Sequence, residues 1–353
     1  MNVFITGATG FLGTELVKSL VKEGHDVYLL IRSMKKARAL LEKLPTGERQ
    51  QVNFIEGNLE TTKLGMTDQA VKKLGDKIDI IYHTAAFLSF DETLRAEIFK
   101  TNLEGTKYVL EFAKEINVPK FIYVSTAYTL GNQTNGYEKL YSLDTNFVNS
   151  YEESKCHSEH IVMSYSDTFD VAIMRPSIII GDSITGEANT TFGLYGILKT
   201  VQLLKKRSIR LDKELYVRLL VDKDAVANIV PVDYVVQALL LAMNSSNNKS
   251  VYNVTNPNPP TNELIFQIVK DAYNFKTLDI ASIEAASDLT EFELSFNKPL
   301  EVFKDYINRS IYFESENTNE LFNQKGLAPL KMDADMLYRI ISGYNKGALV
   351  SNK

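Results

Sequence analysis

The sequence predicts a doubly wound α/β fold with a parallel sheet, accompanied by a smaller and mostly helical C-terminal lobe. Two patterns support this fold class. Through the first 180 residues, short apolar runs rich in Val, Ile and Tyr alternate with stretches whose apolar residues recur at helical spacing. Such alternation is typical of βαβ units, whose strands are buried on both faces of the sheet. Beyond Gly181 the alternation loosens, which indicates that the second lobe begins there.

The expected strands follow one another along the chain in a regular order. They are residues 2–6, 26–31, 52–56, 79–83, 120–125 and 171–175, with a last strand at 250–255. The helical stretches between them include residues 13–24 and 102–116. Because crossover connections between parallel strands are right-handed, these helices are expected to cover the faces of the sheet.

We expect the chain to divide into two discontinuous parts. The segment that begins with "NIVPVDYVVQALLLAM" contains the last strand and is expected to return to the sheet domain. The predicted sheet domain therefore comprises residues 1–180 and 226–256, and the predicted substrate-binding lobe comprises residues 181–225 and 257–353. The turn-rich segment "TNPNPPTNE" marks the point where the chain leaves the sheet again.

Composition excludes several classes of protein. The 353 residues are 44% hydrophobic with a formal net charge of −5, which is ordinary for a globular protein and gives no basic surface for nucleic acid. The single cysteine, Cys156, excludes an intrachain disulfide and a cysteine-built metal site, and it favours a reducing compartment. No apolar run approaches the roughly 20 residues that span a bilayer, and the first residues do not resemble a signal peptide. The sequence therefore predicts a cytoplasmic protein without a membrane span.

The first residues carry a phosphate-binding pattern. "VFITGATGFLGTELV" is expected to form a strand, a tight loop and a helix, with glycines at positions 7, 10 and 13. Gly7 permits the sharp turn, Gly10 lets the backbone approach a pyrophosphate, and Gly13 lets the helix pack closely on the strand. The N-terminus of the helix then offers free N–H groups to the phosphates. This context favours a Rossmann-type dinucleotide-binding domain over an ordinary turn.

The end of the second strand indicates which dinucleotide is bound. Arg32 lies 19 positions beyond Gly13, where an NAD-preferring fold usually has an acidic residue for the ribose 2′-hydroxyl. A planar guanidinium matches a 2′-phosphate instead, so the sequence predicts NADP or NADPH as the cofactor. The alternative is an exposed arginine at a strand end. Lys36 and Arg38 would add positive charge near that phosphate in one interpretation, but a solvated helix face is the favoured interpretation for both.

Seven motifs occur in an order that resembles the extended short-chain dehydrogenase/reductase family. They are "TGATGFLG", "GNL" from Gly57, "HTAA" from His83, "TNLEGT" around Asn102, "VSTAY" from Val124, the Tyr151-x-x-x-Lys155 pair and "RPSIIIG" from Arg175. The segments "RPSIIIGDSITGE", "NIVPVDYV" and "YFESENTNELF" are similar to the thioester-reductase branch of that family. This branch includes terminal reductase domains of peptide synthetases, reductase domains of carboxylic acid reductases and fatty acyl reductases.

The resemblance implies a set of cofactor contacts beyond the glycine loop. Gly57 to Leu59 would lie against the adenine, Ala85 and Ala86 would line the adenosine and pyrophosphate channel, and Pro176 to Ile179 would flank the nicotinamide. The chain departs from the family at Asn58, where aspartate is common, and an uncharged acceptor is expected to weaken that contact. The predicted cofactor-binding residues are Gly7, Thr9, Gly10, Phe11, Leu12, Gly13, Arg32, Asn58, Leu59, Ala85, Ala86, Asn102, Tyr151, Lys155, Pro176, Ser177, Ile178 and Ile179.

The predicted catalytic residues are Thr126, Tyr151 and Lys155. When hydride adds to a carbonyl carbon, negative charge develops on the oxygen, and a hydrogen-bond donor must meet it. The hydroxyl groups of Thr126 and Tyr151 are suited to that task. An ammonium one helical turn from the tyrosine would lower its pKa by on the order of 1–3, and it would also hold the nicotinamide ribose. Without the other motifs, a solvated helix face would be the favoured interpretation of Tyr151 and Lys155.

The resemblance implies reduction of an acyl thioester, carried by coenzyme A or by an acyl or peptidyl carrier protein, to an aldehyde. The sequence does not indicate the acyl group, the carrier, the oligomeric state, or whether a second hydride yields an alcohol. Two other functions stay open. One is a carbonyl reductase or nucleotide-sugar epimerase/dehydratase of the extended family, and the other is an NADP sensor without catalytic activity. Arg32 disfavours the sugar-nucleotide enzymes, which usually use NAD, and the presence of both Tyr151 and Lys155 disfavours the sensor.

No metal site is predicted. His83 lies inside a cofactor motif, and the spacing of His157 and His160 is unlike a zinc motif. Cys156 is expected to be a buried structural thiol, because it faces a different side of the helix from Lys155.

Overall fold

The computed structural model describes residues 1–190, 192–210 and 215–350. The chain forms two compact units. The first comprises Met1–Pro176, Val235–Val254 and Phe313–Ala328, and the second comprises Ser177–Tyr234, Thr255–Tyr312 and Pro329–Lys353. Residues 191, 211–214 and 351–353 of the predicted lobe lie outside the described residues.

The first unit is built around a parallel sheet. Among the described residues its seven strands run in the order β11-β7-β5-β4-β1-β2-β3. The strands are β1 (Asn2–Thr6), β2 (Asp26–Ile31), β3 (Val52–Glu56), β4 (Ile80–His83), β5 (Lys120–Val124), β7 (Asp170–Pro176) and β11 (Ser250–Val254). Every neighbouring pair is parallel. The predicted Rossmann-type fold class is confirmed, including the return of the chain to the sheet at β11.

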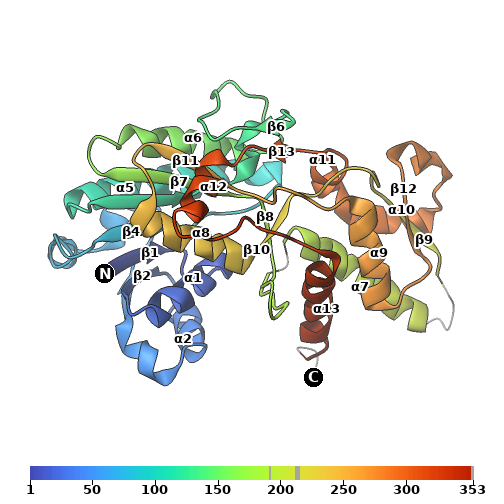
Figure 1. The fold of residues 1–353 in the computed structure, drawn as a ribbon, viewed down its shortest axis with the longest axis horizontal. Coiled ribbons are helices and arrows are strands. Elements are labelled where there is room, and N and C mark those ends of the chain that lie inside the picture. Colours follow the sequence, from blue (N-terminus) through green and yellow to red (C-terminus); the bar gives the residue numbers. More distant parts are fainter. Residues whose placement is uncertain (191, 211–214, 351–353) are drawn as a thin grey trace. The chain divides into compact units, whose positions relative to one another are not determined.

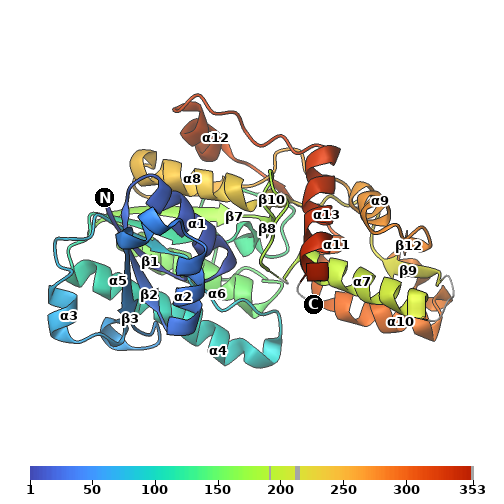
Figure 2. The ribbon, with the colours of Figure 1, turned by 90° about the horizontal axis from the view of Figure 1, so that it is seen from below.

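Helices cover both faces of this sheet (Figure 1). On one face, α5 (Gly105–Glu115) and α6 (Ser150–Ser164) bury Val109, Phe112 and Val162 in a cluster with Phe4 and Phe121 of the strands. On the other face lie α1 (Phe11–Lys22) and α8 (Val232–Ser245), which Figure 2 shows in front of the strands. The remaining helices of the unit are α2 (Met34–Glu42), α3 (Asp68–Lys72), α4 (Arg95–Phe99) and α12 (Glu316–Asn323).

The helix that carries the predicted tyrosine and lysine has a well-formed N-terminus. Asn149 caps α6, because its side chain accepts a hydrogen bond from the Glu152 N–H at 3.0 Å. Glu152 and Glu153 occupy the first turn, where the helix dipole favours negative charge. The polar sequence of this helix therefore contains its own start signal.

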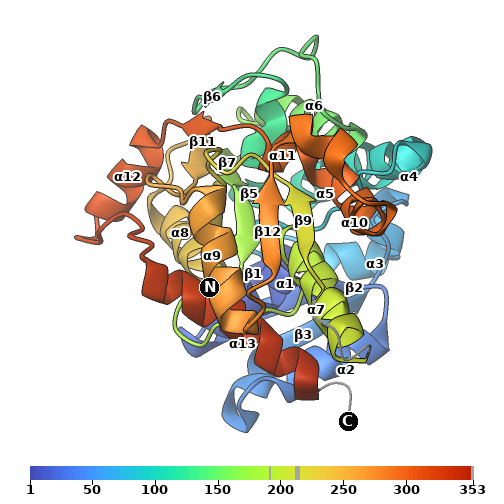
Figure 3. The same cartoon turned by 90° about the vertical axis from the view of Figure 1, so that its right-hand side faces the viewer.

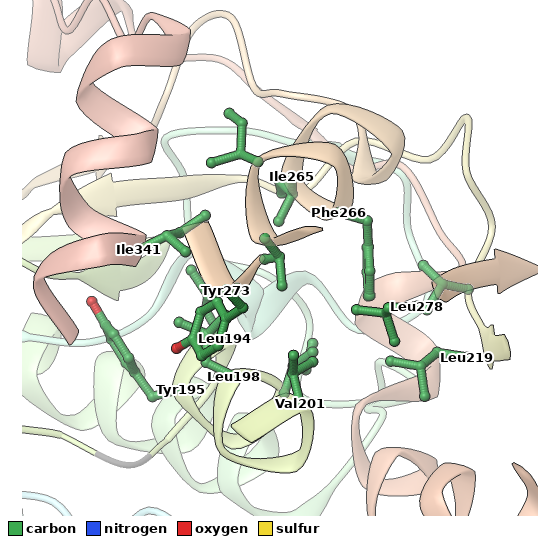
Figure 4. Packing of buried hydrophobic residues seen from close by; sticks show 14 of the residues in the cluster. Leu194, Tyr195, Leu198, Val201, Leu219, Ile265, Phe266, Tyr273, Leu278 and Ile341 are labelled. Carbon is green, nitrogen blue, oxygen red and sulfur yellow. The ribbon is translucent and has the colours of Figure 1, made fainter. Parts of the chain in front are cut away.

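The second unit is mostly helical. Its helices are α7 (Leu194–Arg210), α9 (Asn262–Tyr273), α10 (Glu291–Asn297), α11 (Lys304–Ile307) and α13 (Ala334–Val350). Two short parallel ribbons accompany them: β8 (Ile178–Ile180) pairs with β10 (Ile229–Pro231), and β9 (Val217–Leu220) pairs with β12 (Leu278–Ala281), the latter pair visible in Figure 3. Figure 4 shows the apolar core to which α7, α9 and α13 contribute.

The boundaries of the two units differ from the predicted domains in four places, one of which is residues 255–256, which belong to the second unit. Residues 177–180 and 226–234 belong to the second unit, because β8 and β10 pair with each other and not with the large sheet. Residues 313–328 belong to the first unit. The Glu138 carboxylate holds this segment through hydrogen bonds from the N–H groups of Asn317 and Thr318 at 2.6 and 3.2 Å. This return of the chain to the first unit was not predicted from the sequence.

Within the described residues, no helix has the length and apolar character needed to cross a membrane.

Candidate active site

The glycine loop joins β1 to α1 as a close-packed turn. Gly7 has a φ of +77°, and a Cβ on it would lie 2.6 Å from the backbone nitrogen of Ala85. A Cβ on Gly13 would collide with the Gly7 carbonyl oxygen, so only glycine allows the helix to approach the loop. Gly10 precedes α1 without any side-chain cap, which leaves the N–H groups of the first turn free for an anion.

A cavity of about 620 Å³ opens beside this loop. It is lined by Thr6, Gly7, Thr9, Gly10, Leu30, Ile31, Arg32, Ser33, Lys36, Asn58, Leu59, Glu60, Thr84, Ala85, Ala86 and Thr101. The structure thus brings together eight of the predicted cofactor-binding residues, from Gly7 to Ala86. Most of the lining residues that were not predicted are direct sequence neighbours of predicted ones, as Thr6 and Thr84 are. Their position next to a cofactor motif could have identified them from the sequence.

One end of the cavity carries positive charge. Arg32 follows β2, and Ser33 caps α2 by accepting a hydrogen bond from the Lys36 N–H at 3.5 Å. All three residues line the cavity. Lys36 is also exposed on α2, so its position agrees with the solvated helix face favoured from the sequence and with the alternative of positive charge near the cofactor. Glu60 alone is acidic among the described residues of the lining, and hydrogen bonding to Lys100 holds the pKa of its carboxyl below the usual value.

Asn58 uses its side chain locally. Its Oδ1 accepts a hydrogen bond from the Glu60 N–H at 3.1 Å, and its own backbone N–H donates to the Leu64 carbonyl. The amide therefore fixes the turn at the wall of the cavity. An asparagine can do this as well as an aspartate, since the turn needs an acceptor and no charge.

Asn102 lies outside the cavity lining and is 2% exposed. Its Oδ1 accepts from the Phe87 N–H at 2.7 Å, and its Nδ2 donates to the Phe87 carbonyl and to the Ser154 hydroxyl. The residue sits in a π-helical turn, Lys100–Glu104, directly before α5. It thus ties the segment after β4 to helix α6.

Lys155 is fully buried on α6. Its Nζ donates to the Val124 carbonyl at 2.6 Å and lies 4.2 Å from the ring centroid of Tyr123. Burial lowers the pKa of Lys155 to about 7, and the nearby Glu159 carboxylate opposes this shift. The lysine is therefore held at the carboxyl end of β5, which is the edge where parallel α/β sheets bind ligands.

Tyr151 lies one turn before Lys155 on the same helix and is half-buried. Its ring lies beside that of Phe90, with 6.4 Å between the centroids. Burial raises the pKa of the phenol, and the Glu152 carboxylate raises it further. The predicted lowering of this pKa is not found. The reason is that desolvation of the phenolate dominates, while the Lys155 Nζ is directed to a backbone carbonyl.

Thr126 follows β5 by two residues and is 9% exposed. Its Oγ1 accepts a hydrogen bond from the Tyr128 N–H at 3.3 Å and begins a short helical turn, Ala127–Leu130, that packs on α6. The neighbouring Ser125 hydroxyl is buried without a hydrogen-bond partner among the described residues. The end of β5 thus supplies two hydroxyl groups close to the helix of Tyr151.

The other predicted residues divide between the two units. Phe11, Leu12 and Gly13 begin α1 and do not line the cavity. Pro176 ends β7 in the first unit. Ser177, Ile178 and Ile179 belong to the second unit, where the latter two are part of β8.

His83 and Cys156 have structural environments. The ring nitrogens of His83 lie 2.6 Å from the Thr6 hydroxyl and 2.9 Å from the Thr106 hydroxyl, and burial lowers its pKa to about 3. Burial likewise raises the pKa of the Cys156 thiol to about 12, which disfavours a nucleophilic thiolate. Within the described ranges, no group of three or more His, Cys, Asp and Glu side chains could hold a metal ion.

Comparison with known proteins shows which protein family this chain belongs to. An NAD-binding family model described as "Male sterility protein" matches residues 5–239. The chain belongs to this family. The match covers the glycine loop, Thr126, Tyr151 and Lys155, and the predicted thioester-reductase and fatty acyl reductase branch is confirmed. The first unit is accordingly a domain for a nicotinamide cofactor, and the cavity and glycine cradle described above fit such a group.

Curated relatives carry names that refer to acyl-CoA. The chain is 28% identical over 303 residues to "Fatty acyl-CoA reductase wat" of Drosophila melanogaster, which covers 71% of this chain and 56% of that protein. It is 28% identical to "Fatty acyl-CoA reductase 1" of Gallus gallus, over 72% of this chain and 57% of that protein. The chain therefore spans a little more than half the length of these relatives.

Solved structures with lower identity share the fold. The terminal R domain of the myxalamid PKS-NRPS pathway has a TM-score of 0.82 at 24% identity, covering 99% of this chain and 91% of that one. A thiolation-reductase di-domain from an archaeal non-ribosomal peptide synthetase has a TM-score of 0.77 at 20% identity, covering 99% and 76%. A dTDP-glucose 4,6-dehydratase from Streptomyces venezuelae has a TM-score of 0.72 at 18% identity, covering 99% and 98%.

Proposed function

We propose that this protein is an NADPH-dependent reductase that converts an acyl thioester to an aldehyde. The observation that carries the proposal is the position of Tyr151 and Lys155 on the helix beside the end of β5, in the same unit as the cofactor cavity. The similarity to proteins named fatty acyl-CoA reductases supports a thioester over other carbonyl substrates.

The residues of the glycine loop, Arg32 and the Asn58 turn would hold the cofactor. When bound, the cofactor supplies the hydride that reduces the acyl carbon. We assign the hydroxyl groups of Tyr151 and Thr126 to the carbonyl oxygen, where they donate hydrogen bonds as negative charge develops. Because burial raises the pKa of Tyr151, its hydroxyl stays protonated at neutral pH and is available as a donor. Loss of the thiol from the resulting hemithioacetal then yields the aldehyde.

Lys155 has a pKa near neutrality, so its Nζ exchanges a proton readily at the pH of a cell. Its bond to the Val124 carbonyl fixes the Nζ at the edge of the sheet. We propose that Lys155 holds the ribose of the cofactor and passes a proton to the Tyr151 hydroxyl after the donor is used.

The preference for NADPH rests on the positive end of the cavity. Arg32 and Lys36 offer charged donors and Ser33 offers a hydroxyl, which is a suitable set for a 2′-phosphate. Glu60 lies in the same lining, but its carboxylate is engaged by Lys100 and Thr101 at 2.7 and 3.2 Å. It is therefore less available to a ribose hydroxyl.

The thioester would arrive on a pantetheine arm, from coenzyme A or from a carrier protein. We propose a cytosolic reaction, in keeping with the single buried cysteine.

The experiment is a spectrophotometric assay of NADPH consumption with acyl-CoA and acyl-pantetheine thioesters, run beside UDP- and dTDP-sugars. The proposal predicts turnover with at least one thioester and aldehyde as the product. Turnover of a sugar nucleotide with none of the thioesters would overturn it in favour of an epimerase or dehydratase. Cofactor binding without turnover of any substrate would overturn it in favour of a sensor.

A further inference from the structure

A series of buried hydrogen bonds runs from the wall of the cofactor cavity to helix α6. Five polar side chains of the first unit take part, and each of them is at most 2% exposed. They are Thr6 of β1, His83 of β4, Asn102 of the π-helical turn before α5, Thr106 of α5 and Ser154 of α6. Polar side chains are stable at this depth only when they are hydrogen-bonded, so the series is a specific feature of the interior.

The series begins at the cavity. Thr6 is the last residue of β1, directly before the glycine loop, and it lines the cavity. Its Oγ1 accepts a hydrogen bond from the Ala85 N–H at 3.4 Å, and its carbonyl oxygen accepts one from the Thr84 hydroxyl at 2.7 Å. Thr84 and Ala85 line the same cavity. Thr6 therefore holds two segments of the cavity wall together.

The middle of the series has a fixed direction. The Thr106 hydroxyl donates to the Asn102 carbonyl oxygen at 2.5 Å, so it can only accept from the His83 Nε2, which lies 2.9 Å away. Burial and the nearby Lys155 lower the pKa of His83 to about 3, so the imidazole is neutral and carries a single N–H. That N–H is then on Nε2, and Nδ1 accepts from the Thr6 hydroxyl at 2.6 Å. The hydrogen bonds therefore fix the tautomer of His83.

The series ends at the backbone of Tyr151. The Asn102 Nδ2 donates to the Ser154 hydroxyl at 2.9 Å, and this hydroxyl donates to the Tyr151 carbonyl oxygen at 2.7 Å. The Ser158 hydroxyl, one turn further along α6, donates to the Asn102 carbonyl oxygen at 3.0 Å. Lys155 lies between the two serines in the helix. Asn102 therefore holds the part of α6 that carries Tyr151 and Lys155 at two points.

We propose that His83 is a positioning residue for the reaction. Through Thr106 and Asn102, it holds the turn of α6 that carries Tyr151 and Lys155 at a fixed distance from the wall of the cofactor cavity. A bound cofactor and the two side chains then meet in one geometry. The inference rests on the proposed thioester reduction and adds to it residues that act through others. Because a misplacement of about 1 Å can cost roughly 100-fold in rate, such indirect contacts affect catalysis.

The direction of the hydrogen bonds is tested by nitrogen NMR of the protein with isotope-labelled histidine. His83 should be the Nε2–H tautomer and should stay neutral over the whole pH range in which the protein is folded. Thr106→Val removes the acceptor of this N–H, so it should shift the His83 resonances and leave those of His25 unchanged. An Nδ1–H tautomer would reverse the direction of the series and overturn the inference.

The positioning role is tested by comparing two ligands. Adenosine 2′,5′-bisphosphate can occupy only the part of the cavity near the glycine loop and Arg32, whereas NADPH also reaches the ribose contact proposed for Lys155. Thr106→Val keeps the shape of the side chain and removes its hydroxyl. In titration calorimetry it should weaken NADPH binding by about 10-fold, since a hydrogen bond to a charged group is lost, and leave binding of the bisphosphate unchanged. An equal loss with both ligands, or no loss, would overturn the inference.

The conservative variant separates the hydroxyl from its packing. Thr106→Ser keeps the hydroxyl and loses a methyl group, so it should keep the wild-type ratio of the two affinities. With a thioester that the wild type reduces, Thr106→Val should lower kcat by about 10- to 100-fold with little change in KM for the thioester, and Thr106→Ser should retain kcat. A loss in Thr106→Ser as large as that in Thr106→Val would assign the effect to packing and overturn the inference.

Thr200→Val is the matched control for stability. Thr200 is 8% exposed in the second unit, and its hydroxyl also donates to the carbonyl oxygen four residues earlier, that of Gly196, at 3.1 Å. The variant should lower the free energy of unfolding in urea to a similar degree as Thr106→Val, and it should leave the ratio of the two affinities unchanged. A similar change of the ratio in Thr200→Val would attribute the effect to general destabilisation and overturn the inference.

Failure of this inference is distinguishable from failure of the proposed function. If the wild type reduces no thioester, but Thr106→Val weakens only the binding of NADPH, the proposed reaction alone is contradicted. If the wild type and Thr106→Val reduce a thioester at equal rates and bind NADPH equally, the positioning role alone is contradicted.

Discussion

At the scale of single residues, the chemistry of the candidate site depends on how burial changes the pKa of each titratable side chain. The same desolvation raises the pKa of Tyr151 and lowers the pKa of Lys155, because it disfavours the phenolate in one case and the ammonium in the other. The pair therefore favours a protonated phenol next to an amine that titrates near neutrality. That combination suits a phenol that donates a proton in each turnover and then regains one from the neighbouring amine.

Burial of Lys155 predicts a pH dependence of stability. Its pKa in the folded protein, about 7, lies below that of an unfolded lysine, so the unfolded chain binds more protons between about pH 7 and 10.5. The cost of burying the lysine is full below pH 7 and disappears as the pH rises through that window. We expect Lys155→Met to raise the melting temperature at pH 6 and to lose this advantage by pH 10. The exposed Lys114→Met should show no such trend, and a difference that is constant with pH would contradict the assignment.

Arg32 predicts cofactor preference. Arg32→Ala should lower kcat/KM for NADPH by about 10- to 100-fold, since it removes a charged hydrogen bond to the 2′-phosphate, and should leave kcat/KM for NADH nearly unchanged. Lys35→Ala is the control, because Lys35 is an exposed cation at the start of α2, three residues after Arg32, and does not line the cavity. An equal loss of kcat/KM with both cofactors would mean that Arg32 does not bind the 2′-phosphate.

At the scale of elements, α6 is held in place by polar anchors at its N-terminus and near its middle. Ser150 at its N-terminus donates to Glu92 from its N–H and its hydroxyl, at 2.7 and 2.5 Å. Near its middle, Glu159 receives two hydrogen bonds from the Arg175 guanidinium at 2.7 and 2.5 Å, and both side chains are fully buried. Because Arg175 lies on β7, this ion pair fixes α6 to the sheet.

The buried ion pair predicts a large loss of stability on truncation. Arg175→Met would leave the Glu159 carboxylate buried without its partner and should cost about 3–5 kcal/mol of unfolding free energy. Arg95→Met breaks the more exposed ion pair with Glu153 on the same helix and should cost at most about 1 kcal/mol. Urea unfolding of the two variants measures both values. Similar costs would show that the Arg175 pair is not a principal anchor of α6.

At the scale of the whole molecule, the chain leaves and re-enters the first unit twice. The second return, residues 313–328, depends on Glu138, whose carboxylate also accepts from the Asn253 N–H at 2.8 Å. We expect Glu138→Gln to speed amide hydrogen exchange across 313–328, because an amide cannot accept all of these bonds. The exposed Glu320→Gln should leave exchange unchanged. If Glu138→Gln leaves amide exchange across 313–328 unchanged, apolar packing and not Glu138 holds this segment in the first unit.

Sequence alone predicted the sheet and much of the site, for physical reasons that differ by residue. The strands and the glycine loop are local patterns, so Gly7, Gly10 and the strand β11 were found without tertiary information. The role of Glu138 was missed because it depends on which distant backbone N–H groups meet its carboxylate. The hydrogen bond of the Asn58 side chain within its own turn was not predicted either. The pKa of Tyr151 was predicted with the wrong sign, since helical spacing reveals the lysine and not the depth of burial.

The most direct test of the account measures NADPH consumption and aldehyde formation from an acyl thioester by the wild-type protein and by Tyr151→Phe. The account predicts that the variant binds NADPH with little change in affinity and loses about 10²–10⁴-fold in kcat, because the donor to the carbonyl oxygen is missing. Equal turnover by the two proteins would contradict the assignment of Tyr151. Absence of turnover by the wild type with every thioester tested would contradict the proposed reaction.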